Sequence, residues 1–152
     1  IKDVDISGYS LPRNSSKFEA GTPNIIGAVS LLKSLEYIKS IGGIETIRKH
    51  EQELVNYILP KFAALSDKVQ LIGPKTKDRV AVFSFFIPEH KNFNNVGELF
   101  ASKNIAIRCG GHCAYPLHKN IDIPGTCRAS AYLYNDKEDI DKFFEVLKSL
   151  IN

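Results

Sequence analysis

Several features that would place a chain of 152 residues in a special class are missing from this sequence. It has only three cysteines, whereas a secreted disulfide framework needs an even, dispersed set. No apolar run is long enough to cross a bilayer. There is no block of Lys and Arg, and the net charge of +3 is small, so the electrostatic footprint of a nucleic-acid-binding protein is missing. We therefore expect a cytoplasmic protein with reduced thiols that binds neither membranes nor nucleic acid.

Methionine is also missing, and the first residues, Ile1–Asp5, do not form a signal peptide. These two features predict that the chain is a piece of a longer protein. Its length suits one domain, which would bury roughly 70% of the surface that the unfolded chain exposes. We therefore expect a hydrophobic core of ordinary size.

The first forty residues are predicted to form a short strand or hairpin arm and one helix. Residues 1–17 alternate weakly between polar and apolar and then become rich in turn residues, so they should have little core of their own. Thr22 is the predicted N-cap of a helix whose apolar residues recur at steps of three and four up to Ile41. Gly42-Gly43 should end this helix.

The remaining sequence alternates between helical and strand patterns. A second helix is predicted from Ile44 to Leu65, and Pro60 should kink or shorten it, because an interior proline costs about 3 kcal/mol. Strands are predicted at residues 69–72, 80–87, 105–108 and 127–132, and helices at 95–102, with Asn95 as cap, and after the cap at 135–138. The predicted fold is α/β, with helices packed on a small mixed sheet.

One loop concentrates the chemistry of the chain. Arg108, Cys109, His112 and Cys113 lie close together around a glycine pair. Cysteine reacts as a thiolate, which positive neighbours and partial exposure favour. Cys113 directly follows His112 in a loop that can lift it out of the core, which favours a nucleophile over an inert, packed thiol. Cys109 lies at a strand end, where a small buried apolar residue would serve as well.

Other interpretations of these residues remain open at this point. The possible zinc ligands are Cys109, His112, Cys113, His118 and Cys127. They lack the separated Cys-x2-Cys pair of a structural site, so a metal is not favoured. Arg128 is either a surface residue of an edge strand or a guanidinium aimed at a substrate carboxylate. Thr22 is either only a cap or, at a helix N-terminus preceded by Gly21, part of an anion site.

Three motifs together carry a resemblance to a known family. They are Phe18-Glu19-Ala20-Gly21-Thr22-Pro23-Asn24, Arg108-x-Gly110-x-His112-Cys113-Ala114-x-Pro116-Leu117 and Cys127-Arg128-Ala129-Ser130-x-x-x-Tyr134-Asn135. They resemble the C-terminal part of cysteine desulfurases, in the branch that overlaps selenocysteine lyases, within the class V aminotransferase-like, fold-type I pyridoxal phosphate (PLP) enzymes. The resemblance covers nearly the whole chain, in the right order.

The resemblance implies a role for each matching residue. Cys113 would attack the sulfur of the PLP-bound cysteine substrate and become a persulfide while alanine leaves. Arg128 would hold the substrate carboxylate, Arg108 would shape the same pocket, and His112 would support them. Gly21-Thr22 would reach the cofactor phosphate of the partner subunit, which implies a homodimer.

The resemblance also implies how the whole protein is organised. Residues 1–20 would be the tail of the large PLP-binding domain, and residues 21–152 the small C-terminal domain. The lysine that binds PLP would lie upstream, so this chain alone should be inactive. The complete enzyme would take sulfur from L-cysteine, or selenium from selenocysteine, and pass sulfur to an acceptor protein for iron–sulfur cluster assembly or related sulfur transfer. Gly111 departs from the family, because most relatives have His there.

Two functions from other classes stay open. The isolated domain could be a non-enzymatic sulfur or metal carrier that uses Cys113 and Cys109. It could also be a diverged domain kept for dimerisation, with the apolar helix after Thr22 as its interface.

Overall fold

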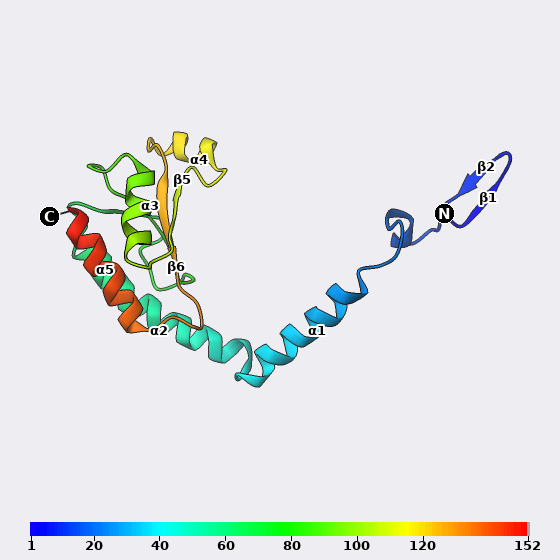
Figure 1. The fold of residues 1–152 in the computed structure, drawn as a ribbon, viewed down its shortest axis with the longest axis horizontal. Coiled ribbons are helices and arrows are strands. Elements are labelled where there is room, and N and C mark those ends of the chain that lie inside the picture. The colour runs from blue at the N-terminus through cyan, green and yellow to red at the C-terminus, as the bar shows by residue number, and fades with distance from the viewer. Residues whose placement is uncertain (152) are drawn as a thin grey trace. The chain divides into compact units, whose positions relative to one another are not determined.

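The structure, a computed structural model, describes residues 1–151 and divides by its internal contacts into two units, Ile1–Gly43 and the part from Ile44 onward (Figure 1). Each unit is described by itself. The predicted boundary between a large-domain tail, residues 1–20, and a small domain, residues 21–152, concerns the whole protein and stays a prediction.

The first unit contains a hairpin, a short 3-10 helix and one long helix. β1 (Asp3–Asp5) pairs antiparallel with β2 (Gly8–Ser10), η1 spans Ser15–Phe18, and α1 spans Ile25–Ser40. The predicted hairpin within residues 1–17 is therefore confirmed. No residue of this unit is buried, as the pattern of a hairpin without its own core indicates.

The N-cap of α1 is Asn24, so the prediction of Thr22 as the cap is wrong. The side-chain oxygen of Asn24 accepts a hydrogen bond of 2.8 Å from the backbone N–H of Gly27. Asn is at least as strong an N-cap as Thr, and here the side chain of Asn24 caps the first turn. Thr22 lies two positions before the cap, outside the helix.

The second unit consists of helices around one four-stranded sheet. Its elements are α2 (Gly43–Ala63), β3 (Gln70–Ile72), β4 (Val82–Phe86), α3 (Phe93–Ser102), β5 (Arg108–Gly110), α4 (Tyr115–Asn120), β6 (Thr126–Ser130) and α5 (Lys137–Ile151). The strand order is β3-β4-β6-β5. The predicted α/β class is confirmed.

The sheet is antiparallel, which corrects the expectation of a mixed sheet. The connection through α3 does bring β5 back in the same direction as β4. However, β6 lies between these two strands and runs opposite to both. Parallel neighbours are therefore absent from the part of the chain that the structure describes.

Several element boundaries differ from the predictions. α2 continues through Pro60 but ends three residues later, at Ala63, which agrees with a shortened helix. The N-cap of α3 is Asn92 and not Asn95, because its side chain accepts the N–H of Asn94. The strand expected at 105–108 is formed at Arg108–Gly110. The six-residue helix α4 was not predicted.

The predicted cap of α5 is confirmed in detail. The backbone N–H of Asp139 donates to Asp136 Oδ1 at 3.0 Å, and Asp139 Oδ2 accepts the N–H of Asp136 at 3.3 Å. Each carboxylate thus satisfies an amide of the other residue, as in a capping box.

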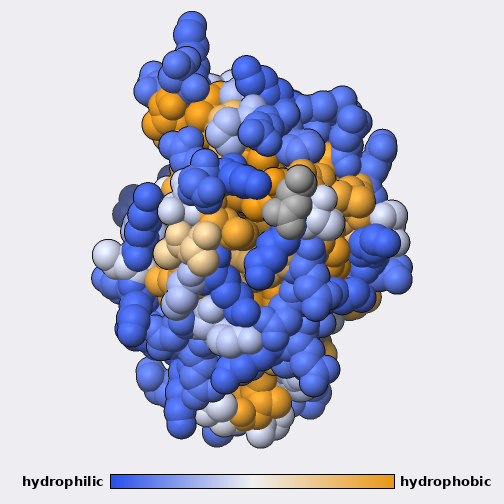
Figure 2. Space-filling model, turned by 90° about the vertical axis from the view of Figure 1, so that its left-hand side faces the viewer, coloured by the Kyte–Doolittle hydropathy of each residue, from blue (hydrophilic) through white to orange (hydrophobic). Residues whose placement is uncertain are grey.

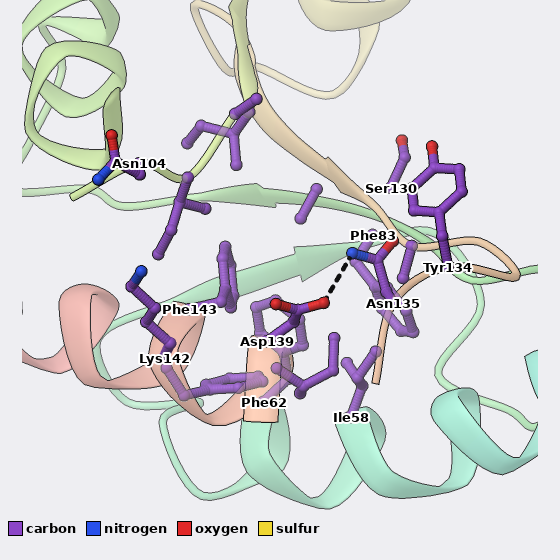
Figure 3. A pocket seen from close by; sticks show the side chains of 17 residues that line it. Ile58, Phe62, Phe83, Asn104, Ser130, Tyr134, Asn135, Asp139, Lys142 and Phe143 are labelled. Carbon is purple, nitrogen blue, oxygen red and sulfur yellow. Dashed lines mark hydrogen bonds between the residues drawn. The ribbon is translucent and has the colours of Figure 1, made fainter. Parts of the chain in front are cut away.

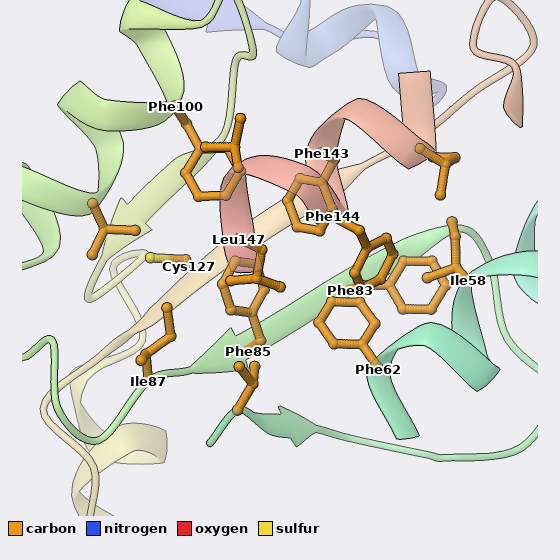
Figure 4. Packing of buried hydrophobic residues seen from close by; sticks show 14 of the residues in the cluster. Ile58, Phe62, Phe83, Phe85, Ile87, Phe100, Cys127, Phe143, Phe144 and Leu147 are labelled. Carbon is orange, nitrogen blue, oxygen red and sulfur yellow. The ribbon is translucent and has the colours of Figure 1, made fainter. Parts of the chain in front are cut away.

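Aromatic side chains of α2, β4 and α5 form the core of the second unit (Figure 4). Phe62 of α2 lies 5.0 Å from Phe144 of α5 and 5.7 Å from Phe83 of β4, measured between ring centroids. Phe85 and Phe143 meet edge to face at 5.8 Å. Such pairs add about 0.5–1.5 kcal/mol each to the burial of apolar area. The core therefore fixes the sheet whose far strands, β5 and β6, carry the candidate site.

The face shown in Figure 2 is mostly hydrophilic, with apolar atoms visible between charged side chains. Within residues 1–151, no helix combines the length and apolar character that crossing a bilayer requires.

Candidate active site

Two arginines face each other across the last two strands. Arg108 of β5 and Arg128 of β6 are direct partners in the antiparallel register. Side chains of direct partners project from the same face of a sheet, and like charges at such positions destabilise it. No salt bridge joins either arginine to an acidic side chain within residues 1–151. The pair therefore suits an anion that bridges two guanidinium groups, such as a carboxylate.

One atom of this pair strengthens that interpretation. Nε of Arg128 is buried and has no hydrogen-bond partner. A buried donor without a partner costs about 1–3 kcal/mol, more when it is charged. Arg108 is exposed, whereas Arg128 is half-buried. Arg128 is thus the inner of two cations, and a ligand that accepts from it would remove an unfavourable contribution.

The loop after β5 holds Cys113 in an unusual backbone conformation. His112 has φ of 51° and Cys113 has φ of 58°, so two successive residues with side chains occupy the left-handed region. This conformation costs roughly 1–2 kcal/mol per residue. Such residues concentrate at functional sites, where the surrounding structure holds them in place. The loop leaves the free thiol of Cys113 exposed to solvent.

His112 is tied to the neighbouring strand. Its Nε2 lies 2.9 Å from the backbone oxygen of Thr126. A carbonyl only accepts, so Nε2 carries the proton and donates it to this bond, and Nδ1 keeps its lone pair in the neutral ring. Nδ1 is buried without a partner. Burial, and then the positive charges of Arg128 and Arg108, lower the pKa of His112 below its usual 6.5. The ring is therefore a neutral acceptor at neutral pH.

Two supporting residues were not recognised from the sequence. The sequence does not single out Thr126, and it offers His118 only as a possible zinc ligand. His118 of α4 is 6% exposed, and its Nε2 lies 3.5 Å from Thr126 Oγ1. The rings of His112 and His118 lie 6.1 Å apart, and the electrostatic interaction with His118 also lowers the pKa of His112. No local signal could have revealed this cluster, because it depends on the pairing of β5 with β6.

The same residues do not form a metal site in the structure. In the range 1–151, no group of three or more His, Cys, Asp or Glu side chains has an arrangement that could hold a metal ion.

Gly111 lies against the ring of Tyr115. A Cβ atom at this position would lie 2.4 Å from the ring of Tyr115, so a side chain here requires that ring to move. Tyr115 is 70% exposed, and its ring can therefore swing away at little cost. The glycine is thus compatible with the loop, and a larger residue would need only this ring to move.

The other face of the same strand pair carries two thiols. Cys109 and Cys127 are direct partners, and their Sγ atoms lie 2.7 Å apart. Cys127 is buried, as Figure 4 shows, and Cys109 is half-buried. Cys109 therefore faces away from the arginine pair.

The predicted site residues fall into both units. β5 and β6 pair Arg108 with Arg128, and the segment between these strands carries His112 and Cys113. Gly21-Thr22 lies in the first unit, just before the cap of α1. Thr22 is exposed, and no hydrogen bond occupies its hydroxyl in the part described. That hydroxyl is therefore available to a ligand.

A cavity of about 280 Å³ lies among core side chains of the second unit (Figure 3). Phe62, Phe83 and Phe143 line it, together with polar groups of α5. Asn135 Nδ2 donates to Asp139 Oδ2 at 3.1 Å beside it. None of the predicted site residues lines this cavity, so it is separate from the Cys113 loop.

Solved structures of cysteine desulfurases share this fold. A family model described as aminotransferase class-V matches residues 1–143. The chain belongs to the aminotransferase class-V family.

The most similar proteins include cysteine desulfurases, which confirms the resemblance found from the three motifs. A probable cysteine desulfurase of Pyrococcus abyssi is 38% identical over 152 residues, which are 99% of this chain and 37% of that protein. A cysteine desulfurase of Escherichia coli is 38% identical over 151 residues, covering 99% of this chain and 36% of the relative. The apo structure of the cysteine desulfurase from Thermococcus onnurineus superposes with a TM-score of 0.88 at 36% identity, over 99% of this chain and 37% of that one. The chain thus spans little more than a third of the length of these relatives.

Proposed function

We propose that this chain is part of a PLP-dependent cysteine desulfurase in which Cys113 accepts the sulfur of L-cysteine. The observation that carries the proposal is the cross-strand pair of Arg108 and Arg128, which has no acidic partner, followed by a strained loop that exposes a free thiol. A paired cation site and a nucleophile are the two groups that such a reaction needs from this part of the protein.

The arginine pair would bind the carboxylate of the substrate. Arg128 is the better candidate for a bidentate contact, because its buried Nε has no other partner. Arg108 is more exposed and would add charge at the rim of the same site. This arrangement would orient the amino acid with its side-chain sulfur toward the loop.

Cys113 would then attack that sulfur as a thiolate. The new S–S bond forms as the C–S bond of the substrate breaks, so Cys113 carries a persulfide and the rest of the substrate leaves as alanine. The exposed position of Cys113 would let the persulfide reach an acceptor protein, for iron–sulfur cluster assembly or related sulfur transfer. His112 would accept a proton or hydrogen bond at Nδ1 during substrate binding.

PLP, when bound, would supply the electron sink that makes the C–S bond labile. The exposed hydroxyl of Thr22, with Gly21 before it, would contact the cofactor phosphate of the partner subunit in a homodimer. The lysine that carries PLP would lie outside this chain. The whole protein is therefore required for activity.

The test uses the full-length protein with PLP and L-cysteine, and it measures alanine and sulfide. Replacing Cys113 with Ala should lower turnover by at least about 100-fold, the scale of losing a nucleophile. Cys109→Ser is the matched control and should retain turnover, because Cys109 faces the other side of the sheet. Wild-type turnover in Cys113→Ala, or an equal loss in Cys109→Ser, would contradict the proposal. L-selenocysteine as a second substrate would establish the preference between sulfur and selenium.

A further inference from the structure

A second pair of thiols lies on the opposite face of β5 and β6 from the arginine pair. Successive residues of a strand point to opposite faces, so the partners Cys109 and Cys127 project away from Arg108 and Arg128. Both cysteines are free, and their Sγ atoms are in contact at 2.7 Å. The role proposed for Cys113 does not use either of them.

The backbone around this pair already suits a covalent link. Direct partners in an antiparallel pair have Cα atoms about 4.5 or 5.5 Å apart, depending on their hydrogen bonding. Disulfides span Cα separations of roughly 4.4–6.8 Å, so no strand has to move. Helix α3 leaves room for the sulfurs, because a Cβ added at Gly97 would still lie 3.9 Å from Cys109 Sγ.

The two thiols differ in access and in acidity. Cys127 is 2% exposed, whereas Cys109 is only half-buried. Contact with the Cys127 thiol lowers the pKa of Cys109, whose thiolate it stabilises. The same contact, together with burial, raises the pKa of Cys127. A reagent from solvent would therefore meet Cys109 first, and Cys127 would react only through its neighbour.

We propose that Cys109 and Cys127 form a dithiol site that exchanges with low-molecular-weight disulfides and closes into an intrachain disulfide between β5 and β6. The Cys109 thiolate attacks one sulfur of the small disulfide and releases one small thiolate. Cys127 loses its proton and attacks Cys109 Sγ, which releases the second small thiolate. The two cysteines are thereby oxidised by two electrons, and the small disulfide is reduced to two thiols.

The link would have a defined structural consequence. Residues 109 and 127 each adjoin an arginine of the pair, so a disulfide would fix the register of β5 against β6. It would also anchor the start of the loop that carries Cys113. This site does not depend on the desulfurase proposal, because its chemistry involves neither Cys113 nor a cofactor.

The test uses the full-length protein with Cys113→Ser, which removes the exposed thiol as a competitor. The protein is equilibrated in mixtures of oxidised and reduced glutathione, quenched by alkylation and digested for peptide mass spectrometry. A linked pair of peptides that contain Cys109 and Cys127 should accumulate as the mixture becomes oxidising, and dithiothreitol should release it. Both cysteines remaining fully alkylated across the whole range would overturn the proposal, and this measurement needs no substitution in the core.

Two further variants test the order of attack. With Cys127→Ser, Cys109 should stop at the mixed disulfide with glutathione, which mass spectrometry detects directly. With Cys109→Ser, the buried Cys127 should be modified at least about tenfold more slowly. Equal rates for the two cysteines would contradict the assignment of Cys109 as the attacking thiol and Cys127 as the resolving one.

Discussion

The two units of the chain differ in whether their apolar residues are exposed or buried. In the first unit, α1 carries apolar side chains on all sides, and Ile26 and Leu32 are 81% and 54% exposed. In the second unit, Phe62 and Phe85 are 2% and 0% exposed. A helix that is apolar all round is typical of a buried position, whereas amphipathic helices complete a core of their own. The second unit therefore has a core of its own, and the first has none.

The same difference separates the parts of the candidate site. Arg108, Cys113 and Arg128 are positioned by one sheet, whose order depends on the core of the second unit alone. Gly21-Thr22 precedes an uncovered helix in a chain that spans about 37% of a curated relative's length. We expect the remaining part of the whole protein to cover α1 and so to position this segment.

The largest effect should come from deleting core volume in the second unit. Phe62→Ala should lower the free energy of unfolding of the 152-residue chain by about 3–5 kcal/mol, because it opens a cavity among stacked aromatic rings. Leu32→Ala in α1 should change it by less than about 0.5 kcal/mol, as for other exposed positions. Denaturant unfolding measures both values.

The same substitutions in the full-length protein test whether α1 is covered there. In the full-length protein, Leu32→Ala should lower the free energy of unfolding as much as a core substitution if the rest of that protein covers α1. A large cost of Leu32→Ala in the 152-residue chain itself would show that the first unit already has a core, and the comparison would fail.

The next largest effects should be on ligand binding, and they should differ between substitutions in the two units. In the full-length enzyme, Arg128→Ala should weaken the binding of L-cysteine by about 2–5 kcal/mol, seen as a raised KM, because a carboxylate would lose its buried partner. Thr22→Ala in the first unit should instead weaken the retention of PLP, seen in the visible absorbance of the cofactor. An unchanged KM and rate in Arg128→Ala would remove that residue from the site.

Local patterns in the sequence were sufficient for part of the fold. The periodic apolar residues of α2 and α5 and the apolar run of β4 predicted those elements, because each reflects burial along one segment. The cap was misplaced at Thr22 instead of Asn24, because Thr and Asn both cap well and capping propensity does not separate them. The antiparallel sheet was missed because strand order is set by contacts between distant segments.

Only the local features of the site could be predicted from the sequence. Cys113 and its loop could be recognised because an arginine, a histidine and a thiol lie within a few residues of each other. The pairing of Arg108 with Arg128 depends on register, and the contact between His112 and Thr126 depends on that pairing. The same holds for the contact between the thiols of Cys109 and Cys127. No spacing in the sequence determines a cross-strand contact.

A smaller effect should come from the helix caps. Asn24→Ala and Asp136→Ala should each cost about 1 kcal/mol, because each removes the acceptor of a backbone N–H at a helix start. Asp136→Ala should appear in the global unfolding of the second unit, since α5 packs in its core. Asn24→Ala should lower only the helical circular dichroism signal, and Thr22→Ala should leave that signal unchanged. A loss of helix in Thr22→Ala would restore Thr22 as a cap.

The smallest effect should be the contribution of His112 to the pH dependence of the free energy of unfolding. Its pKa in the folded chain is below 6.5, so the unfolded chain takes up the proton first as the pH falls. The free energy of unfolding should therefore fall below pH 6.5 and be unaffected by this group above it. Solvent screening should keep the change below about 1 kcal/mol. Measuring the free energy of unfolding of the wild type and of His112→Gln between about pH 5 and 8 isolates the contribution of His112, since the variant should lack this fall at low pH. An equal pH dependence in both proteins would contradict the assigned shift.

The location of the persulfide tests the central proposal most directly. The full-length protein is given L-cysteine for one turnover, its thiols and persulfides are alkylated at once, and its peptides are mapped by mass spectrometry. The proposal predicts a persulfide on Cys113 and its complete loss in Cys113→Ala, with PLP still bound. A persulfide on Cys109, or on any cysteine other than Cys113, would contradict the proposal that the exposed loop of the second unit carries the reaction.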